Sequence, residues 1–219
     1  MLKKQEKLVT FVYIVNKCKS ILRNIKRVMV KRIILLGDSP YIREVEGVLQ
    51  YALDRYESMG INRIINKFRV QKHVFVDPFI MRLTNEHPEL FTVSLYKYGD
   101  LIPKRNKELF NTYSFNFLEN TEEDLCKKGE LAWCGFTHDY ALSYLITKGY
   151  NDIILIGTAD FVSGPHFSNP YDLVCSEKLK LESKRFIEEV CCKKALIRTC
   201  NPESILNIPR ININELLEC

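Results

Sequence analysis

The chain has no apolar run long enough to cross a bilayer, and it has little glycine or proline. The longest apolar run, residues 8–15, contains eight residues, whereas a membrane-spanning helix needs about 20. Nine glycines and eight prolines in 219 residues are too few for a collagen-like or low-complexity chain. A hydrophobic fraction of 46% instead predicts a globular domain with a sizeable core.

The spacing signals that usually accompany functional cysteines are also missing. Eight cysteines are present, but there is no Cys-x-x-Cys pair, and from the short apolar run near the start we expect no secretory leader. Disulfide frameworks and structural zinc sites normally show one or the other. We therefore expect reduced, mostly buried thiols in a cytoplasmic protein.

Positive charge is concentrated at the N-terminus. Residues 1–32 hold ten Lys/Arg and one Glu, whereas the remainder holds 22 Lys/Arg and 26 Asp/Glu. A nucleic-acid-binding surface would spread its basic residues over the fold, so we expect no nucleic-acid partner.

Apolar residues in this basic segment recur at alternating steps of three and four: Leu8, Phe11, Val15, Cys18, Leu22, Ile25 and Met29. The pattern predicts a basic amphipathic helix over residues 4–30, preceding a domain of residues 31–219. Such a helix lies on an anionic membrane surface, or it packs on the body or on another chain. In the first case the protein would be peripheral to the inner face of the membrane.

Strand and helix patterns alternate through residues 31–219. Buried strands are predicted at 32–36, 61–65, 74–76, 91–95, 152–156 and 195–199, with helices at 42–56, 136–148 and 176–192. Residues 98–130 give no clear pattern, and 162–175 read as a loop. The alternation predicts an α/β fold: a mostly parallel, Rossmann-like sheet with helices on both faces.

Polar and small residues follow three of these strands: Gly37-Asp38-Ser39, Asp77-Pro78 and Gly157 to Asp160. Ligands of parallel α/β sheets bind outside the carboxyl ends of the strands. We therefore expect a binding site where these three segments meet.

The segment IILLGDS (33–39) resembles the nucleophile block of GDSL-type (SGNH) hydrolases, with Ser39 as the nucleophile. The family also uses an asparagine after a later strand and an Asp-x-x-His near the C-terminus. Here Ala159 stands at the asparagine position, no Asp-x-x-His occurs, and no histidine follows His166. A serine hydrolase is therefore kept as an alternative.

A longer stretch resembles the bacterial sialyltransferases of glycosyltransferase family 42 and, more distantly, pterin pyrophosphokinase-like domains. The resemblance is carried, in order, by KRIILLGDSPYIREVE (31–46), GINRI (60–64), HVFVDP (73–78), WCGFTHDYALSYLITKGYNDIILIGTADF (133–161) and IRTCNPES (197–204). It covers most of residues 31–206. The helix that leads into Gly-Tyr, a strand and Gly-x-Asp-Phe is its most specific part.

The resemblance implies transfer of a sugar from a nucleotide donor of the CMP-sialic acid type to a glycan hydroxyl, without a bound metal or other cofactor. By position, the nucleotide pocket would comprise Gly37, Asp38, Ser39, Asn62, Asp77, Cys134, Gly135 and Asp160. The histidine that would deprotonate the acceptor is His166.

The chain departs from the family at several positions. Asp38 and Asp77 stand where the family has asparagines, and the family's phosphate-binding tyrosine pair is not reproduced. Together with Asp160, these aspartates suggest an Mg²⁺ site that would neutralise a pyrophosphate. A non-catalytic nucleotide-binding protein is the third interpretation.

Overall fold

The computed structural model describes residues 30–102, 106–161, 167 and 176–218. The predicted basic helix therefore lies outside the described residues, except for Val30, and so does most of the predicted loop at 162–175. Within the described ranges, no helix combines the length and apolarity that a membrane span requires.

Residues 31–219 form one compact unit. Its strands are β1 (Arg32–Leu36), β2 (Ser58–Ile61), β3 (Lys72–Val74), β4 (Phe91–Leu95), β5 (Lys107–Ser114), β6 (Cys126–Lys127), β7 (Glu130–Trp133), β8 (Asp152–Ile156) and β9 (Leu196–Thr199). Its α-helices are α2 (Ile42–Arg55), α3 (Leu83–Glu86), α4 (Thr137–Thr147) and α5 (Glu177–Glu189). Short 3₁₀ turns include η1 (Asn62–Asn66), η2 (Pro78–Ile80), η5 (Cys191–Lys193) and η6 (Ile213–Leu216).

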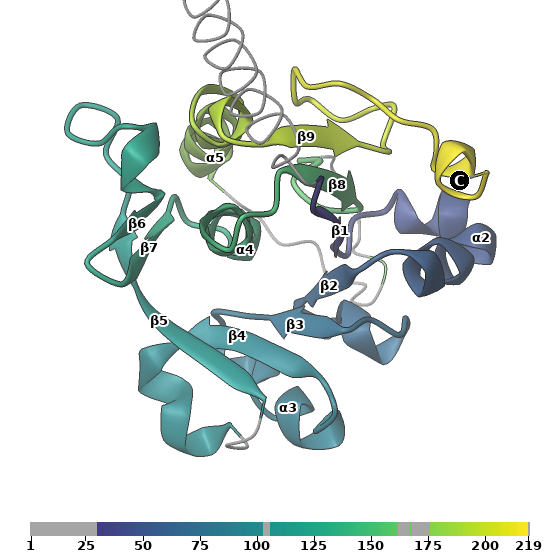
Figure 1. Cartoon of the computed structure of the whole chain (residues 1–219), viewed down its shortest axis with the longest axis horizontal. Helices are drawn as coiled ribbons and strands as arrows, with labels where there is room; N and C mark the ends of the chain where they lie inside the picture. The colour runs from purple at the N-terminus through teal and green to yellow at the C-terminus, as the bar shows by residue number, and fades with distance from the viewer. Residues whose placement is uncertain (1–29, 103–105, 162–166, 168–175, 219) are drawn as a thin grey trace, which may run out of the picture. The chain divides into compact units, whose positions relative to one another are not determined.

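The strands form one sheet in the order β6-β7-β5-β4-β3-β2-β1-β8-β9. Every pairing between these strands is parallel except the β6–β7 hairpin, whose turn is Lys128-Gly129. The sheet curls around α4, so that β7 and β8 lie on different sides of this helix (Figure 1). The prediction of a mostly parallel α/β fold is confirmed.

Helices cover both faces of the sheet. Alternate residues of β1 point to opposite sides: Ile33 and Leu35 pack in one core with α4 and α5, and Ile34 and Leu36 pack in another with α2. All four side chains are fully buried. Burial on both faces explains why β1 and β8 are uninterrupted apolar runs in the sequence.

Two predicted strands differ from those in the structure. The strand expected at 61–65 ends at Ile61, because Asn62 adopts a left-handed conformation (φ 53°) and starts η1. The strand expected at 74–76 runs instead over Lys72–Val74, since Val74 is the last residue paired with β2. In both cases the strand ends at the last residue paired between β2 and β3, which is Ile61 in β2 and Val74 in β3.

The unassigned region 98–130 contains β5 and β6 and the first residue of β7, and the sequence pattern indicated none of these three strands. β5 is only half-buried along its length and carries polar residues at several positions, so it lacks the apolar run that marked β1 and β8. β6 and β7 are short. These strands are defined by their partners rather than by their own composition.

One carboxylate ties three adjacent strands together at their amino ends. Asp152 of β8 accepts hydrogen bonds from Arg32 of β1 (2.6 Å) and from Arg198 of β9 (2.5 Å). The Asp152 side chain is 5% exposed. Removing it would leave two partly buried guanidinium groups without their shared partner.

We predict that Asp152→Asn lowers the free energy of unfolding by roughly 2 kcal/mol, because a partly buried charge pair is broken from one side. Denaturant unfolding measures the change. The control is Asp54→Asn, which breaks the exposed pair with Arg69 and should change stability much less. Equal effects of the two substitutions would contradict the prediction.

Candidate functional site

The strand order reverses beside β1. From β1 the chain builds β2, β3, β4, β5 and β7 on one side, and it then returns to place β8 and β9 on the other. In open α/β sheets the crevice at such a reversal, outside the carboxyl ends of the strands, is where ligands bind. The carboxyl ends of β2, β1 and β8 therefore define the candidate site.

Two of the three predicted segments, and the predicted residue Asn62, follow these three strands, whereas Asp77-Pro78 comes after β3. Leu36, the last residue of β1, pairs with Gly60 of β2 and with Ile156 of β8. Gly37 to Ser39 therefore leave β1 between Asn62, which follows β2, and Gly157 to Asp160, which follow β8. Adjacent strands lie about 4.8 Å apart, so the three turns are neighbours.

The turns after β1 and β8 are in close backbone contact. Ser39 N donates to Gly157 O at 2.8 Å, and Gly37 N donates to Ile156 O at 2.9 Å. A Cβ on Gly37 would lie 2.4 Å from Gly157 O, and one on Gly157 would lie 2.4 Å from Ile42 Cδ1. Glycine is therefore required at both positions.

Asp160 is the buried charge of the site. It is 1% exposed, and its Oδ2 accepts a 2.6 Å hydrogen bond from Ser39 Oγ. Its Oδ1 is buried without a hydrogen-bond partner in the described part of the chain. Burial raises the pKa of Asp160 to about 6, although the side chains of Ser39, Asn201 and Thr199 act to lower it.

Asn62 presents a second buried oxygen atom without a partner. Its Oδ1 is buried and accepts no hydrogen bond from the described residues. Its backbone carbonyl is held by His73 Nε2 at 3.0 Å. Ala159 and Phe161 share the left-handed conformation of Asn62, with φ of 56° and 54°, so strained backbone is concentrated at these strand ends.

Asp38 and Asp77 do not join Asp160 in a metal site within the described residues. Asp77 caps η2 by accepting from Phe79 N at 2.9 Å. The carbonyl of Asp38 accepts from Phe167 N at 2.9 Å. Over the described ranges, no group of three His, Cys, Asp or Glu side chains is arranged to hold an ion.

Cys134 and Gly135 lie between β7 and α4, and the aromatic residues that follow them contact the loop after β8. Phe136, the next residue, stacks on His138 with ring centroids 5.0 Å apart. Phe161, which follows Asp160, contacts both rings edge-on at 5.6 and 5.4 Å. The curled sheet thus brings the start of α4 to the loop after β8.

His138, Asp139 and Ser183 form a buried polar cluster at the start of α4. This cluster was not predicted from the sequence. His138 Nε2 lies 2.9 Å from Ser183 Oγ, and Ser183 Oγ donates to Asp139 Oδ1 at 2.5 Å. The serine proton points to the carboxylate, so His138 acts as donor to the serine. A histidine base would need the opposite direction, and we infer that the cluster fastens α5 to α4.

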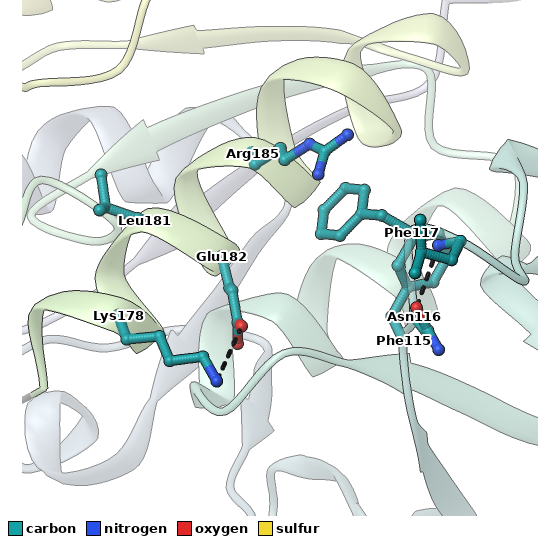
Figure 2. Close-up of a pocket in the computed structure, with 8 residues that line it drawn as sticks. Phe115, Asn116, Phe117, Lys178, Leu181, Glu182 and Arg185 are labelled. Carbon is teal, nitrogen blue, oxygen red and sulfur yellow. Dashed lines mark hydrogen bonds and ion pairs between the residues drawn. The ribbon is translucent and has the colours of Figure 1, made fainter.

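A groove of about 690 Å³ lies between residues 115–118 and α5 (Figure 2). Arg185 lies over the ring of Phe117 at 4.1 Å and pairs with Glu189 at 2.9 Å. Lys178 pairs with Glu182 at 3.9 Å. The groove contains none of the eight predicted nucleotide-binding residues, and its charges are paired along one helix.

The structure brings Ser39 and Asp160 into direct contact, places Gly37 against the turn after β8, and places Asn62 at the neighbouring strand end. Asp77 serves as a helix cap. His166, the predicted catalytic base, lies outside the described residues.

Comparison with protein-family models, with curated proteins and with solved structures gave no significant match.

We predict that Asp160→Asn stabilises the protein at pH 8 but not near pH 4. The folded pKa of about 6 exceeds the unfolded value, so the wild type loses stability as pH rises from about 4 to 6. The full loss, present above pH 6, amounts to roughly 3 kcal/mol at most. Denaturant unfolding of both proteins across this range measures the difference, and a pH-independent difference would contradict the assignment.

Proposed function

We propose that this chain is a glycosyltransferase that binds the nucleotide of a sugar donor at the carboxyl ends of β2, β1 and β8. The sugar would pass to a glycan hydroxyl by direct displacement at the anomeric carbon. The proposal rests on the resemblance to family 42 sialyltransferases, and the reversal of strand order beside β1 supports a Rossmann-like nucleotide site.

One observation carries the proposal: two of the predicted residues hold buried oxygen atoms that have no hydrogen-bond partner among the described residues. Asn62 Oδ1 and Asp160 Oδ1 lie at the strand ends on either side of Gly37 to Ser39. Buried polar atoms in folded proteins are almost always hydrogen-bonded, so such exceptions need a reason. A nucleoside supplies suitable donors in its ribose hydroxyls and, for cytidine, in its exocyclic amino group.

The chemistry of the site suits a nucleoside better than a bare phosphate. A phosphate placed against Asp160 would repel the carboxylate, whereas a hydroxyl would donate to it. The turns after β1 and β8 pack so closely that a Cβ on Gly37 or on Gly157 would lie within 2.4 Å of a neighbouring atom. In this proposal His166 takes the acceptor proton, and neither a metal nor another cofactor takes part.

A serine hydrolase is the second candidate, and the Ser39–Asp160 hydrogen bond favours it. The carboxylate accepts the serine proton at 2.6 Å, which is the geometry of a base beside a nucleophile. A non-catalytic nucleotide-binding protein would share the pocket of the transferase but show no turnover.

We predict that cytidine monophosphate raises the melting temperature of the full chain. At about 100 times Kd the ligand adds roughly 2.7 kcal/mol, or about 5–10 °C for a domain of this size. Asn62→Gly should reduce the shift without abolishing it, because it removes an oxygen that has no partner among the described residues and keeps the backbone conformation. Asp54→Asn, on the exposed surface of α2, serves as the control and should leave it unchanged.

Parallel measurements with Mg²⁺ and with EDTA separate the metal-free mechanism from the Mg²⁺ alternative. A shift that disappears with EDTA would favour the alternative. Absence of any shift with millimolar nucleotides would refute the proposed site.

We predict that a fluorophosphonate probe leaves Ser39 unlabelled in the full chain. The Ser39 hydroxyl lies against a carboxylate whose raised pKa reflects burial, and no described histidine contacts it. Mass spectrometry of the digested protein measures labelling, with Ser39→Ala as the blank. Stoichiometric modification of Ser39 would replace the transferase proposal with the hydrolase.

A further inference from the structure

His73 is a fully buried histidine in the middle of β3. It is 0% exposed, and burial lowers its pKa to about 3, so the ring is neutral at physiological pH. Its ring lies 5.2 Å from that of Phe75. A buried polar ring in a sheet interior costs stability unless its hydrogen bonds are made.

Only one of the two ring nitrogens has a partner among the described residues. Nε2 lies 3.0 Å from the backbone oxygen of Asn62, whereas Nδ1 is buried without a partner. A carbonyl oxygen can only accept, so Nε2 must carry the proton. The single N–H of the neutral His73 ring therefore donates to the backbone carbonyl of Asn62, the residue that follows β2.

That residue is in a strained conformation. Asn62 has φ of 53°, which costs an asparagine less than most residues but still disfavours the turn. The neighbouring pair Gly60 and His73 is in register between β2 and β3. His73 is therefore fixed in β3, and its Nε2–H holds the carbonyl of Asn62 just beyond the end of the neighbouring strand β2.

We propose that His73 is a positioning residue that fixes Asn62 in its left-handed conformation and so places the unpartnered Asn62 Oδ1 in the nucleotide site. The inference rests on the proposed function, because it assigns Asn62 to that site. An apolar residue at position 73 would satisfy packing and would avoid the unpartnered Nδ1. The presence of a histidine at this buried position is therefore explained by the hydrogen bond that its Nε2–H donates to the Asn62 carbonyl.

Three substitutions at position 73 separate positioning from packing. His73→Phe and His73→Leu keep an apolar side chain in the core but remove the donor, and His73→Gln keeps an N–H that reaches a carbonyl. Calorimetric titration of the full chain with cytidine monophosphate gives Kd, and thermal unfolding without ligand gives stability. Two core substitutions are used because one of them can overpack.

We expect His73→Phe and His73→Leu to raise Kd about tenfold, without a matching fall in melting temperature. His73→Gln should restore Kd to within about threefold of the wild type. In an Asn62→Gly background the substitutions at 73 should change Kd less than twofold, because the residue that they position no longer carries the oxygen.

A Kd unaffected by the loss of the donor would overturn the inference. So would a Kd that rises only in proportion to lost stability, with no rescue by glutamine. If the wild type binds no nucleotide, the proposed function fails, and this inference fails with it. If it binds and Asn62→Gly weakens binding while His73→Phe and His73→Leu do not, only the inference fails.

A ligand-free measurement tests the hydrogen bond itself. Two-bond ¹H–¹⁵N correlation spectra distinguish histidine tautomers, and the His73 signals are identified by their loss in His73→Gln. The Nε2–H tautomer is expected at pH 7. The Nδ1–H tautomer would overturn the inference whatever the nucleotide experiments show.

Discussion

The burial of β1 on both faces, between β2 and β8, is the constraint on which the rest of the structure depends. Its side chains join the two cores, one with α4 and α5 and the other with α2. Because β1 is central, the chain must add strands first on one side and then on the other. The reversal that results brings Asn62, Gly37 to Ser39 and Asp160 to neighbouring strand ends, where ligands of such sheets bind.

The site departs from the rules that the rest of the fold obeys. Asn62, Ala159 and Phe161 are left-handed, and Asp160 is a buried carboxyl group whose Oδ1 has no partner in the described ranges of the chain. Each departure lowers stability, and each lies just after β2 or β8. Such a concentration of unfavourable features is typical of binding and active sites, where the surrounding packing holds them in place.

The buried pair at the start of α4 shows how the fold tolerates other titratable groups. Burial raises the pKa of Asp139 to about 7 and lowers that of His138 to about 3. Between about pH 4 and 6.5 the proton is on Asp139 in the folded state, where both side chains are neutral, and on His138 in the unfolded state, where both are charged. Each state therefore binds one proton. The pair therefore adds little pH dependence to stability in this range.

The sequence by itself determined the fold class and the ends of β1 and β8. β1 and β8 are predicted from RIILL and DIILI because strands buried on both faces are apolar throughout, and the residues that follow them were identified from their letters alone. β5, β6 and β7 could not be predicted, since their half-buried residues depend on which strands pair with them. Tertiary structure alone decided the strand order, which places Asn62 and Asp160 on either side of Gly37 to Ser39, and it alone gave His73 its role. Both depend on contacts between residues far apart in the chain, which local periodicity does not encode.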